Sequence, residues 1–399
     1  MNDNTHPILR IPAGATDDDL IQVMARFSYD GVSVEEICEL TRCLALSGDQ
    51  LSFPEGIVTA DIASTGGPAS LSTLLCPLFL ASGGAWVPKI GVPGRPAGGI
   101  DVLAQIGGYN ISLPPSSAQR VVERVGYCHF IAGSLYAPLD ARLFSLRQSR
   151  GAQGVPSLVV ASLLAKKLAA GVRMVGLDVR VSPFGNFGET LDQARQNAVL
   201  FCTVGKALGL TCSCFLTDGT RPPQPYLGRG EALLALDAVF SGNARGWLTA
   251  HLYVCERMAS QTVGRAASPD RGELAEIFLA HVEAQGGSKE AFAQKVENVR
   301  SQPIFEITAR KRGFVGYDLA AFRSVLTELQ GLHRSERDPF PDPGGIILQI
   351  APGTFVERDE VVAVVRLMHG QSAPTISAIQ AAIHVDPDPG YPTMFELIS

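Results

Sequence analysis

A short segment near residue 61 has the residue types of a backbone site for an anion. It reads Asp-Ile-Ala-Ser-Thr-Gly-Gly-Pro-Ala-Ser-Leu-Ser-Thr, from Asp61 to Thr73. Gly66 and Gly67 let the backbone approach a ligand closely, and the N–H groups at the start of a following helix attract negative charge. Hydroxyl donors are present at Ser64, Ser70, Ser72 and Thr73. The segment contains no cation and no Gly-Lys-Ser/Thr, so it is not a Walker loop, and a tight strand-to-helix turn without a ligand has a similar sequence.

A second group of polar residues occurs on an expected helix. Ser162 and Lys166 are four residues apart, so they share one helical face. Their neighbours on that face are apolar: Val159, Leu163 and Ala170. A lysine turned inward there needs an anionic or carbonyl partner. The alternative is that Lys166 and Lys167 form a solvated pair, and that Arg147, in an arginine-rich turn, lies on the surface.

The bulk composition excludes several classes of function. The chain has 399 residues and a formal net charge of −6, which argues against non-specific nucleic-acid binding. The most apolar run is too short and too broken to cross a bilayer, and the N-terminal residues lack a secretory signal pattern. The cysteines include no Cys-x-x-Cys pair. We therefore expect reduced thiols, a cytoplasmic protein, no metal site, and no membrane or nucleic-acid partner.

The elements that must position these groups follow an α/β pattern. Residues 16–50 are expected to be helical, with Thr16 and Ser33 as N-caps. From about residue 57, a strand, the Gly-Gly turn, a buried helix and a second strand indicate a parallel sheet. Residues 172–181 have the apolar character of a central parallel strand. The last hundred residues alternate with Gly/Pro turns, as in an antiparallel or barrel-like region.

The segment from Asp61 resembles the Lys-His-Ser-Thr-Gly-Gly-Val-Gly-Asp signature of thymidine and pyrimidine-nucleoside phosphorylases. Other blocks resemble this family in the same order along the chain: residues 85–90 with 94–103, 143–171, 175–195, 215–230 and 313–318. The resemblance covers nearly the whole chain from about residue 16, although the N-terminal helical part is shorter than usual.

The resemblance implies a fold and an assembly. We expect a mixed α/β protein with a helical domain (1–54 and 138–170), an α/β domain with a mixed sheet (55–137 and 171–310) and a β-rich C-terminal domain (311–399). It also implies a homodimer formed through the helical part, and a cleft that closes by domain movement.

The resemblance further implies an enzyme that acts on the C1′–N1 bond of a pyrimidine nucleoside. The family's base-binding Arg, Ser and Lys fall at Arg147, Ser162 and Lys166. Arg147 and Lys166 are expected to stabilise negative charge on the departing base, and Ser162 to hold its N3/O4 edge. Phe187 takes the place of a family phenylalanine, and it either stacks on the base or only packs.

The phosphate half of the family site departs from the pattern. The family's loop lysine and histidine fall at Ile62 and Ala63, and a threonine falls at Ile100. A phosphate dianion in a partly dry cleft without a paired cation costs on the order of several kcal/mol. The remaining acceptor loop and its substitute cations are Ser64, Thr65, Gly66, Gly67, Thr73, Lys89 and Arg95.

The nucleophile therefore stays open at this stage. Phosphate is possible as a co-substrate, with no other cofactor expected. Water is an alternative, with Asp61 or Asp101 to position it, unless these carboxylates only cap a turn or pair with Arg95. Another acceptor is also conceivable.

Two rival interpretations belong to other classes. One is a nucleoside-binding relative or subunit without turnover. The other is an anthranilate-type phosphoribosyltransferase, whose loop resembles Ser-Thr-Gly-Gly. That chemistry needs Mg²⁺ and acidic ligands. The segment Leu-Asp-Val-Arg-Val at residues 177–181 supplies only one acidic side chain, Asp178.

Overall fold

The computed structural model describes residues 11, 14–29, 31–67, 69, 71–94, 96–185, 187–266, 268–368, 372–388 and 395–399. Two capped helices begin the fold, α1 (Asp17–Phe27) and α2 (Val34–Ala45). The hydroxyls of Thr16 and Ser33 accept from the N–H groups of Asp19 and Glu36, whose carboxylates bond back to the cap N–H groups. Both predicted N-caps are confirmed.

A mixed four-stranded sheet forms the centre of the molecule. Its strand order is β1 (Ala60–Ser64), β4 (Met174–Val181), β5 (Thr211–Asp218) and β13 (Phe395–Ile398). The first three strands are parallel, and β13 pairs antiparallel with β5. β4 is buried along nearly its whole length, as predicted for a central parallel strand.

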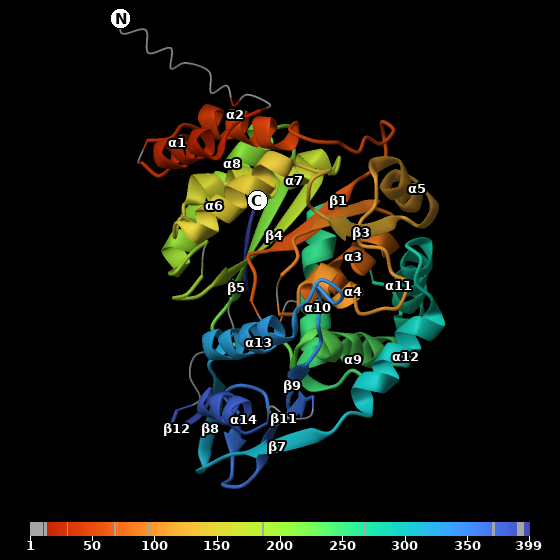
Figure 1. The fold of residues 1–399 in the computed structure, drawn as a ribbon, viewed down its shortest axis with the longest axis vertical. Helices are drawn as coiled ribbons and strands as arrows, with labels where there is room; N and C mark the ends of the chain where they lie inside the picture. The colour runs from red at the N-terminus through yellow and green to blue at the C-terminus, as the bar shows by residue number, and fades with distance from the viewer. Residues whose placement is uncertain are drawn as a thin grey trace, which may run out of the picture.

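Helices from distant parts of the chain gather on the sheet (Figure 1). α6 (Pro138–Ser149) and α7 (Pro156–Ala169) each begin with a proline in the first turn, where its missing N–H costs nothing. They lie beside α1, α2 and α8 (Leu191–Ala207), and α2 contacts both α7 and α8. The predicted break near residues 151–155 separates α6 from α7.

The segment after β1 builds a second small layer. α3 (Ser72–Ser82) ends at Gly83 and leads to β2 (Val87–Gly91). α4 (Gly99–Leu103), α5 (Pro115–Val125) and β3 (Tyr127–Ile131) follow, with β2 parallel to β3. After β5 come the short β6 (Tyr226–Leu227) and four helices: α9 (Arg229–Phe240), α10 (Gly246–Val263), α11 (Arg271–Ala284) and α12 (Lys289–Arg300).

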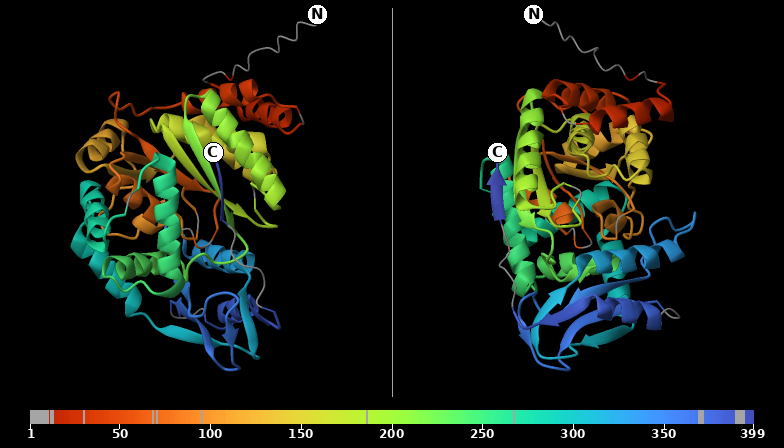
Figure 2. Two further views of the ribbon diagram at one scale, coloured as in Figure 1. Left: turned by 180° about the vertical axis from the view of Figure 1, so that it is seen from behind. Right: turned by 90° about the vertical axis from the view of Figure 1, so that its left-hand side faces the viewer.

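Among the described residues, the C-terminal section contains two antiparallel sheets and two helices. It lies at the end of the molecule opposite α1 and α2 (Figure 2). One sheet has the order β6, β9 (Gly344–Leu348), β11 (Val361–Leu367) and β7 (Ile304–Thr308). The other has β10 (Phe355–Val356), β8 (Gly313–Tyr317) and β12 (Ile383–Asp386). The strand-turn pattern did not identify α13 (Leu319–His333) or α14 (Ser372–Ala381). β7 lies before the expected boundary at 311, and β13 returns to the central sheet.

A buried ionic network joins the C-terminal section to the helices below the sheet. Arg366 of β11 contacts Glu231 of α9 at 2.7 Å and Asp342 at 2.7 Å. Lys295 of α12 approaches Asp342 at 2.9 Å. Because buried charges are costly unless paired, this network fixes how the two parts meet. Within the described ranges, no helix has the length and apolar character needed to cross a membrane.

Candidate active site

The glycine loop connects β1 to α3 and is fixed at both sides. The N–H group of Thr65 donates to the Asp178 carbonyl of β4 at 3.0 Å, and the Ser64 hydroxyl accepts from the Gly66 N–H at 3.2 Å. Gly66 and Gly67 have φ values of 107° and 133°, which L side chains rarely adopt. The loop therefore requires both glycines. It lines two cavities, of about 190 Å³ and about 550 Å³.

The smaller cavity contains the three expected base-binding residues. Arg147, Ser162 and Lys166 are buried and line it from α6 and α7. The loop, β2 and α4 form the remaining walls. Most of the expected acceptor loop lines the same cavity: Ser64, Thr65, Gly66, Gly67, Thr73 and Lys89. The structure thus brings together residues that are about a hundred positions apart in the sequence.

Lys166 has an anionic partner, as its inward position requires. Its Nζ donates to Asp140 Oδ2 at 2.6 Å and to the Ser162 hydroxyl at 3.0 Å. Asp140 is itself buried, and its Oδ1 has no hydrogen-bond partner among the described residues. Sequence patterns did not identify Asp140. Asp140 lies two helical turns before Arg147 on the same face of α6, and this spacing could have identified it from the sequence.

Arg147 closes the turn between α6 and α7. Its guanidinium donates to the carbonyls of Ala152 at 3.3 Å, Gln153 at 2.9 Å and Leu158 at 3.2 Å. Burial lowers the pKa of Arg147, and the nearby Asp140 opposes that shift. The side chain stays charged, because an arginine pKa starts far above neutral pH. It therefore supplies a fixed cation at the cavity wall.

Asp61 is enclosed by two lysines. Its carboxylate accepts from Lys89 at 2.7 Å and from Lys167 on its other oxygen. Burial acts to raise the pKa of Asp61, but the charges of Lys167 and Lys89 outweigh it and the pKa is lowered. Lys89 also donates to the Ile62 carbonyl at 2.6 Å. One carboxylate therefore serves two ammonium groups, so this cluster keeps a net positive charge at the cavity edge.

Asp101 also has internal partners. It is fully buried on α4, where its Oδ1 accepts from the Gly94 N–H at 2.9 Å and from Arg229 at 3.0 Å. Neither Asp61 nor Asp101 belongs to the lining of the smaller cavity, and both placements favour the structural alternative over water positioning. Arg95 lies outside the described residues, as does Ser70.

Two uncharged residues form part of the acceptor end of the smaller cavity. Ala63 and Ile100 line it, whereas Ile62 is buried in the sheet, where a Cβ on Gly176 would meet it at 2.6 Å. Ile62 therefore does not add to the apolar surface that Ile100 gives this cavity. Ile62 and Ala63 take the positions of the family's loop lysine and histidine, while Lys89, Lys167 and His129 line the cavity from other elements.

His129 is another ionisable group of this region that sequence patterns did not identify. Its Nδ1 lies 3.1 Å from the Tyr127 hydroxyl, and its ring lies so close to Gly99 that a Cβ there would be 2.3 Å from it. Burial, followed by the charge of Lys89, lowers the pKa of His129 well below its usual value. The imidazole that lines the cavity is therefore neutral at physiological pH.

Phe187 lies in the protein core rather than at either cavity. It is 1% exposed within the main hydrophobic core, and it belongs to neither of the two cavity linings. The loop after β4 turns its ring inward, so packing is its role. Phe144 of α6 is the aromatic residue that lines the smaller cavity.

Comparisons with known proteins agree with this architecture. Residues 57–164 match the α/β domain of a glycosyl transferase family. The thymidine phosphorylase of Agrobacterium fabrum is 29% identical over 368 residues, which cover 86% of this chain and 82% of that protein. The human thymidine phosphorylase is 31% identical over 271 residues, covering 64% of this chain and 56% of that protein. The pyrimidine-nucleoside phosphorylase of Staphylococcus epidermidis is 26% identical and covers 84% of this chain and 81% of that protein.

Among solved structures, the anthranilate phosphoribosyltransferase of Thermus thermophilus aligns with a TM-score of 0.48 and 17% identity, over 71% of this chain and 94% of that one. The similarity to the phosphorylases extends over most of the chain and includes the glycine loop, α6 and α7. The chain is therefore homologous to thymidine phosphorylases over most of its length and contains the α/β domain of a glycosyl transferase family.

Proposed function

We propose that the protein transfers the glycosyl group of a pyrimidine nucleoside by breaking the C1′–N1 bond. One observation carries the proposal: Arg147, Ser162 and Lys166 line one buried cavity together with the glycine loop. The relatives named thymidine phosphorylase and pyrimidine-nucleoside phosphorylase support the same class of substrate.

The cavity offers what a departing pyrimidine needs. Bond cleavage leaves negative charge on the base, spread over N1 and the carbonyl oxygens. Lys166 has three N–H donors, and its bonds to Asp140 and Ser162 use two of them, which leaves one for a base carbonyl. Arg147 adds a fixed positive charge. Donors fixed in a site of low dielectric stabilise developing charge more strongly than they would in water.

The acceptor end favours a neutral nucleophile over phosphate. Ser64 and Thr73 offer hydroxyl groups there, Ala63 stands where the family's loop histidine falls, and the carboxylate of Asp61 holds Lys89 and Lys167. Water enters such a site without the desolvation cost of a dianion. In our proposal, water attacks C1′ while the C1′–N1 bond breaks. Neutral His129 takes the water proton and later returns it to N1 of the base.

Incubation with uridine, thymidine or cytidine, with and without phosphate, tests the reaction. Release of free base without phosphate means hydrolysis, and release only with phosphate means phosphorolysis. We expect Lys166→Met to lower kcat/KM about 100-fold or more. Lys206→Met, on the exposed face of α8, is the matched control and should leave kcat/KM unchanged.

A second candidate is nucleoside binding without turnover. The observation that favours it is the engagement of Arg147 with three backbone carbonyls, which holds its guanidinium in a structural role. Calorimetric binding of uridine, without base release under any of the conditions above, would select this second candidate.

A further inference from the structure

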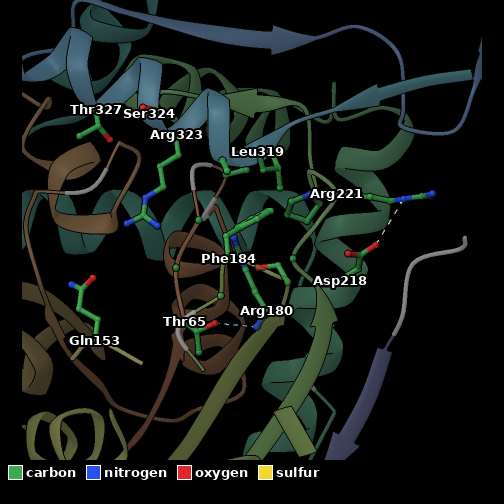
Figure 3. A pocket seen from close by; sticks show the side chains of 18 of the residues that line it. Thr65, Gln153, Arg180, Phe184, Asp218, Arg221, Leu319, Arg323, Ser324 and Thr327 are labelled. Carbon is green, nitrogen blue, oxygen red and sulfur yellow. Dashed lines mark hydrogen bonds and ion pairs between the residues drawn. The ribbon is translucent and has the colours of Figure 1, made fainter. Parts of the chain in front are cut away.

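The larger cavity lies where parallel sheets commonly bind ligands. Thr65, Ser182 and Asp218 line it from the carboxyl ends of β1, β4 and β5. α13 covers it from the opposite side, so the cavity lies between the central sheet and the C-terminal section (Figure 3). The crevice outside the carboxyl ends of parallel strands is the usual ligand position in such folds. Neither the base pocket nor the acceptor end uses this space.

Two arginines from different elements flank the glycine loop in this cavity. Arg323 extends from α13 toward the loop, and Arg180 of β4 lies behind it (Figure 3). Arg323 is exposed, and it has no ion pair within the described part of the chain. Arg180 is 8% exposed, with Asp178 at 3.1 Å and the Ser72 hydroxyl at 3.3 Å.

The loop backbone lies directly against one of these cations. A Cβ on Gly67 would be 2.9 Å from Arg180 Nη1, so a side chain there would displace the end of this arginine. The remaining arginine of the lining, Arg221, is 3.9 Å from Asp218 and points away from Arg323 (Figure 3). Arg323 is therefore an arginine of this lining that has no ion pair among the described residues, Arg180 is a second donor beside it, and Glu328 adds a carboxylate to the same lining.

The glycine loop is a wall shared by both cavities. Thr65, Gly66 and Gly67 line the base cavity on one side and the arginine cavity on the other. Gln153 connects them further, because it lines the larger cavity while its carbonyl accepts from Arg147. A ligand whose base occupies the smaller cavity, and whose sugar lies along the loop, therefore reaches the larger cavity with its next substituent.

We propose that this cavity binds the phosphoryl group of the substrate, which makes the substrate a pyrimidine nucleoside monophosphate. This inference rests on the proposed function, because the smaller cavity must hold the base. Arginine suits phosphoryl oxygens, since its planar guanidinium donates two parallel hydrogen bonds. The Phe184 ring, half exposed in the same lining, covers the apolar side of the sugar.

The test compares kcat/KM for release of uracil from uridine, uridine 5′-monophosphate and uridine 3′-monophosphate. We expect one of the two nucleotides to exceed uridine by about 10-fold or more, as expected for one added charge-assisted contact. Arg323→Gln should reduce that ratio toward one. Glu328→Gln, which removes a carboxylate from the same lining, should raise it. Arg358→Gln, with a side chain 75% exposed on the C-terminal section, is the control and should not change the ratio.

The outcomes separate this inference from the function on which it rests. Uracil release from uridine at the same efficiency as from both nucleotides overturns the inference and leaves glycosyl transfer intact. If no substrate releases uracil, glycosyl transfer fails. In that case calorimetry tests the phosphoryl site by itself. If a uridine monophosphate binds and Arg323→Gln weakens that binding, the assignment of the larger cavity is supported.

Free phosphate is the competing source of the same chemistry. If inorganic phosphate binds alone, loses affinity in Arg323→Gln and accelerates uracil release from uridine, the cavity holds a co-substrate and the nucleotide assignment is overturned. If phosphate instead competes with the nucleotide and does not accelerate release from uridine, the nucleotide assignment is supported.

Discussion

The two lysines that contact Asp61 indicate a structural role for this carboxylate rather than the positioning of water. In the sequence, Asp61 ends a strand beside the glycine turn and is a candidate for positioning water. In the structure it is fully buried between Lys89 and Lys167, which come from β2 and α7. The three charges tie β1 to two other elements. A buried ion pair whose partner is removed leaves an uncompensated charge.

At this scale we expect Asp61→Asn to act on stability. Two buried lysines would lose their counter-charge, so the free energy of unfolding should fall by about 3–5 kcal/mol. Urea unfolding followed by circular dichroism measures it. Asp192→Asn, with a side chain 86% exposed, serves as the matched control and should change little. A variant of Asp61 with unchanged unfolding but a large loss of kcat would instead restore the water-positioning role.

At the scale of the elements, the glycine loop depends on where a strand ends and a helix begins. β1 ends at Ser64 and α3 begins at Ser72, so the chain between them must pass both cavities in a few residues. Gly66 and Gly67 both adopt positive φ, but only Gly67 touches another side chain at the Cβ position. A substitution at Gly66 therefore tests backbone strain alone, whereas one at Gly67 tests strain together with the contact to Arg180.

We expect Gly66→Ala and Gly67→Ala to lose similar stability and differ in ligand binding. Each substitution places a side chain at positive φ, which costs about 1–3 kcal/mol. Only Gly67→Ala also displaces the Arg180 guanidinium, because its Cβ would lie 2.9 Å from Nη1. Thermal unfolding and nucleotide titration of the same two proteins measure both effects. Equal loss of nucleotide affinity in the two variants would contradict a specific contact with Arg180.

At the scale of the whole molecule, the fold buries several histidines in the neutral form. His251 of α10 and His281 of α11 are fully enclosed, and burial lowers their pKa values to about 4 and about 3. His129 of β3 shifts in the same direction. Unfolding returns all three to an ordinary pKa near 6.5, so below that pH the unfolded chain binds more protons than the folded one.

Stability should therefore fall as the pH drops from about 6.5 toward 4. Each of the three histidines contributes up to about 1.4 kcal/mol per pH unit within its own window. Glu231, whose pKa burial raises, acts in the opposite direction, so single variants are needed to isolate the histidines. His251→Gln should flatten the slope between pH 6 and 5, whereas exposed His384→Gln should not. An unchanged slope in His251→Gln would show that His251 is charged in the fold.

Local patterns were enough to predict much of the framework. Thr16 and Ser33 were identified as caps because a cap depends only on residues within one turn. The apolar run at residues 172–181 indicated a central strand because both of its faces are covered. The four-residue spacing of Ser162 and Lys166 indicated a shared face, which the contact between them confirms. α13 was missed, since Gly and Pro residues on both sides of it matched a strand-and-turn pattern.

What the sequence determined by itself was local: where helices begin, which strand is buried, and which residues share a helical face. The tertiary structure alone decided the partners of Lys89, Lys166 and Asp101, and it alone brought Arg323 to the glycine loop. The reason is physical. Helical and strand periodicities act over a few residues, whereas charge pairing and cavity formation depend on distances in space between segments that are far apart along the chain.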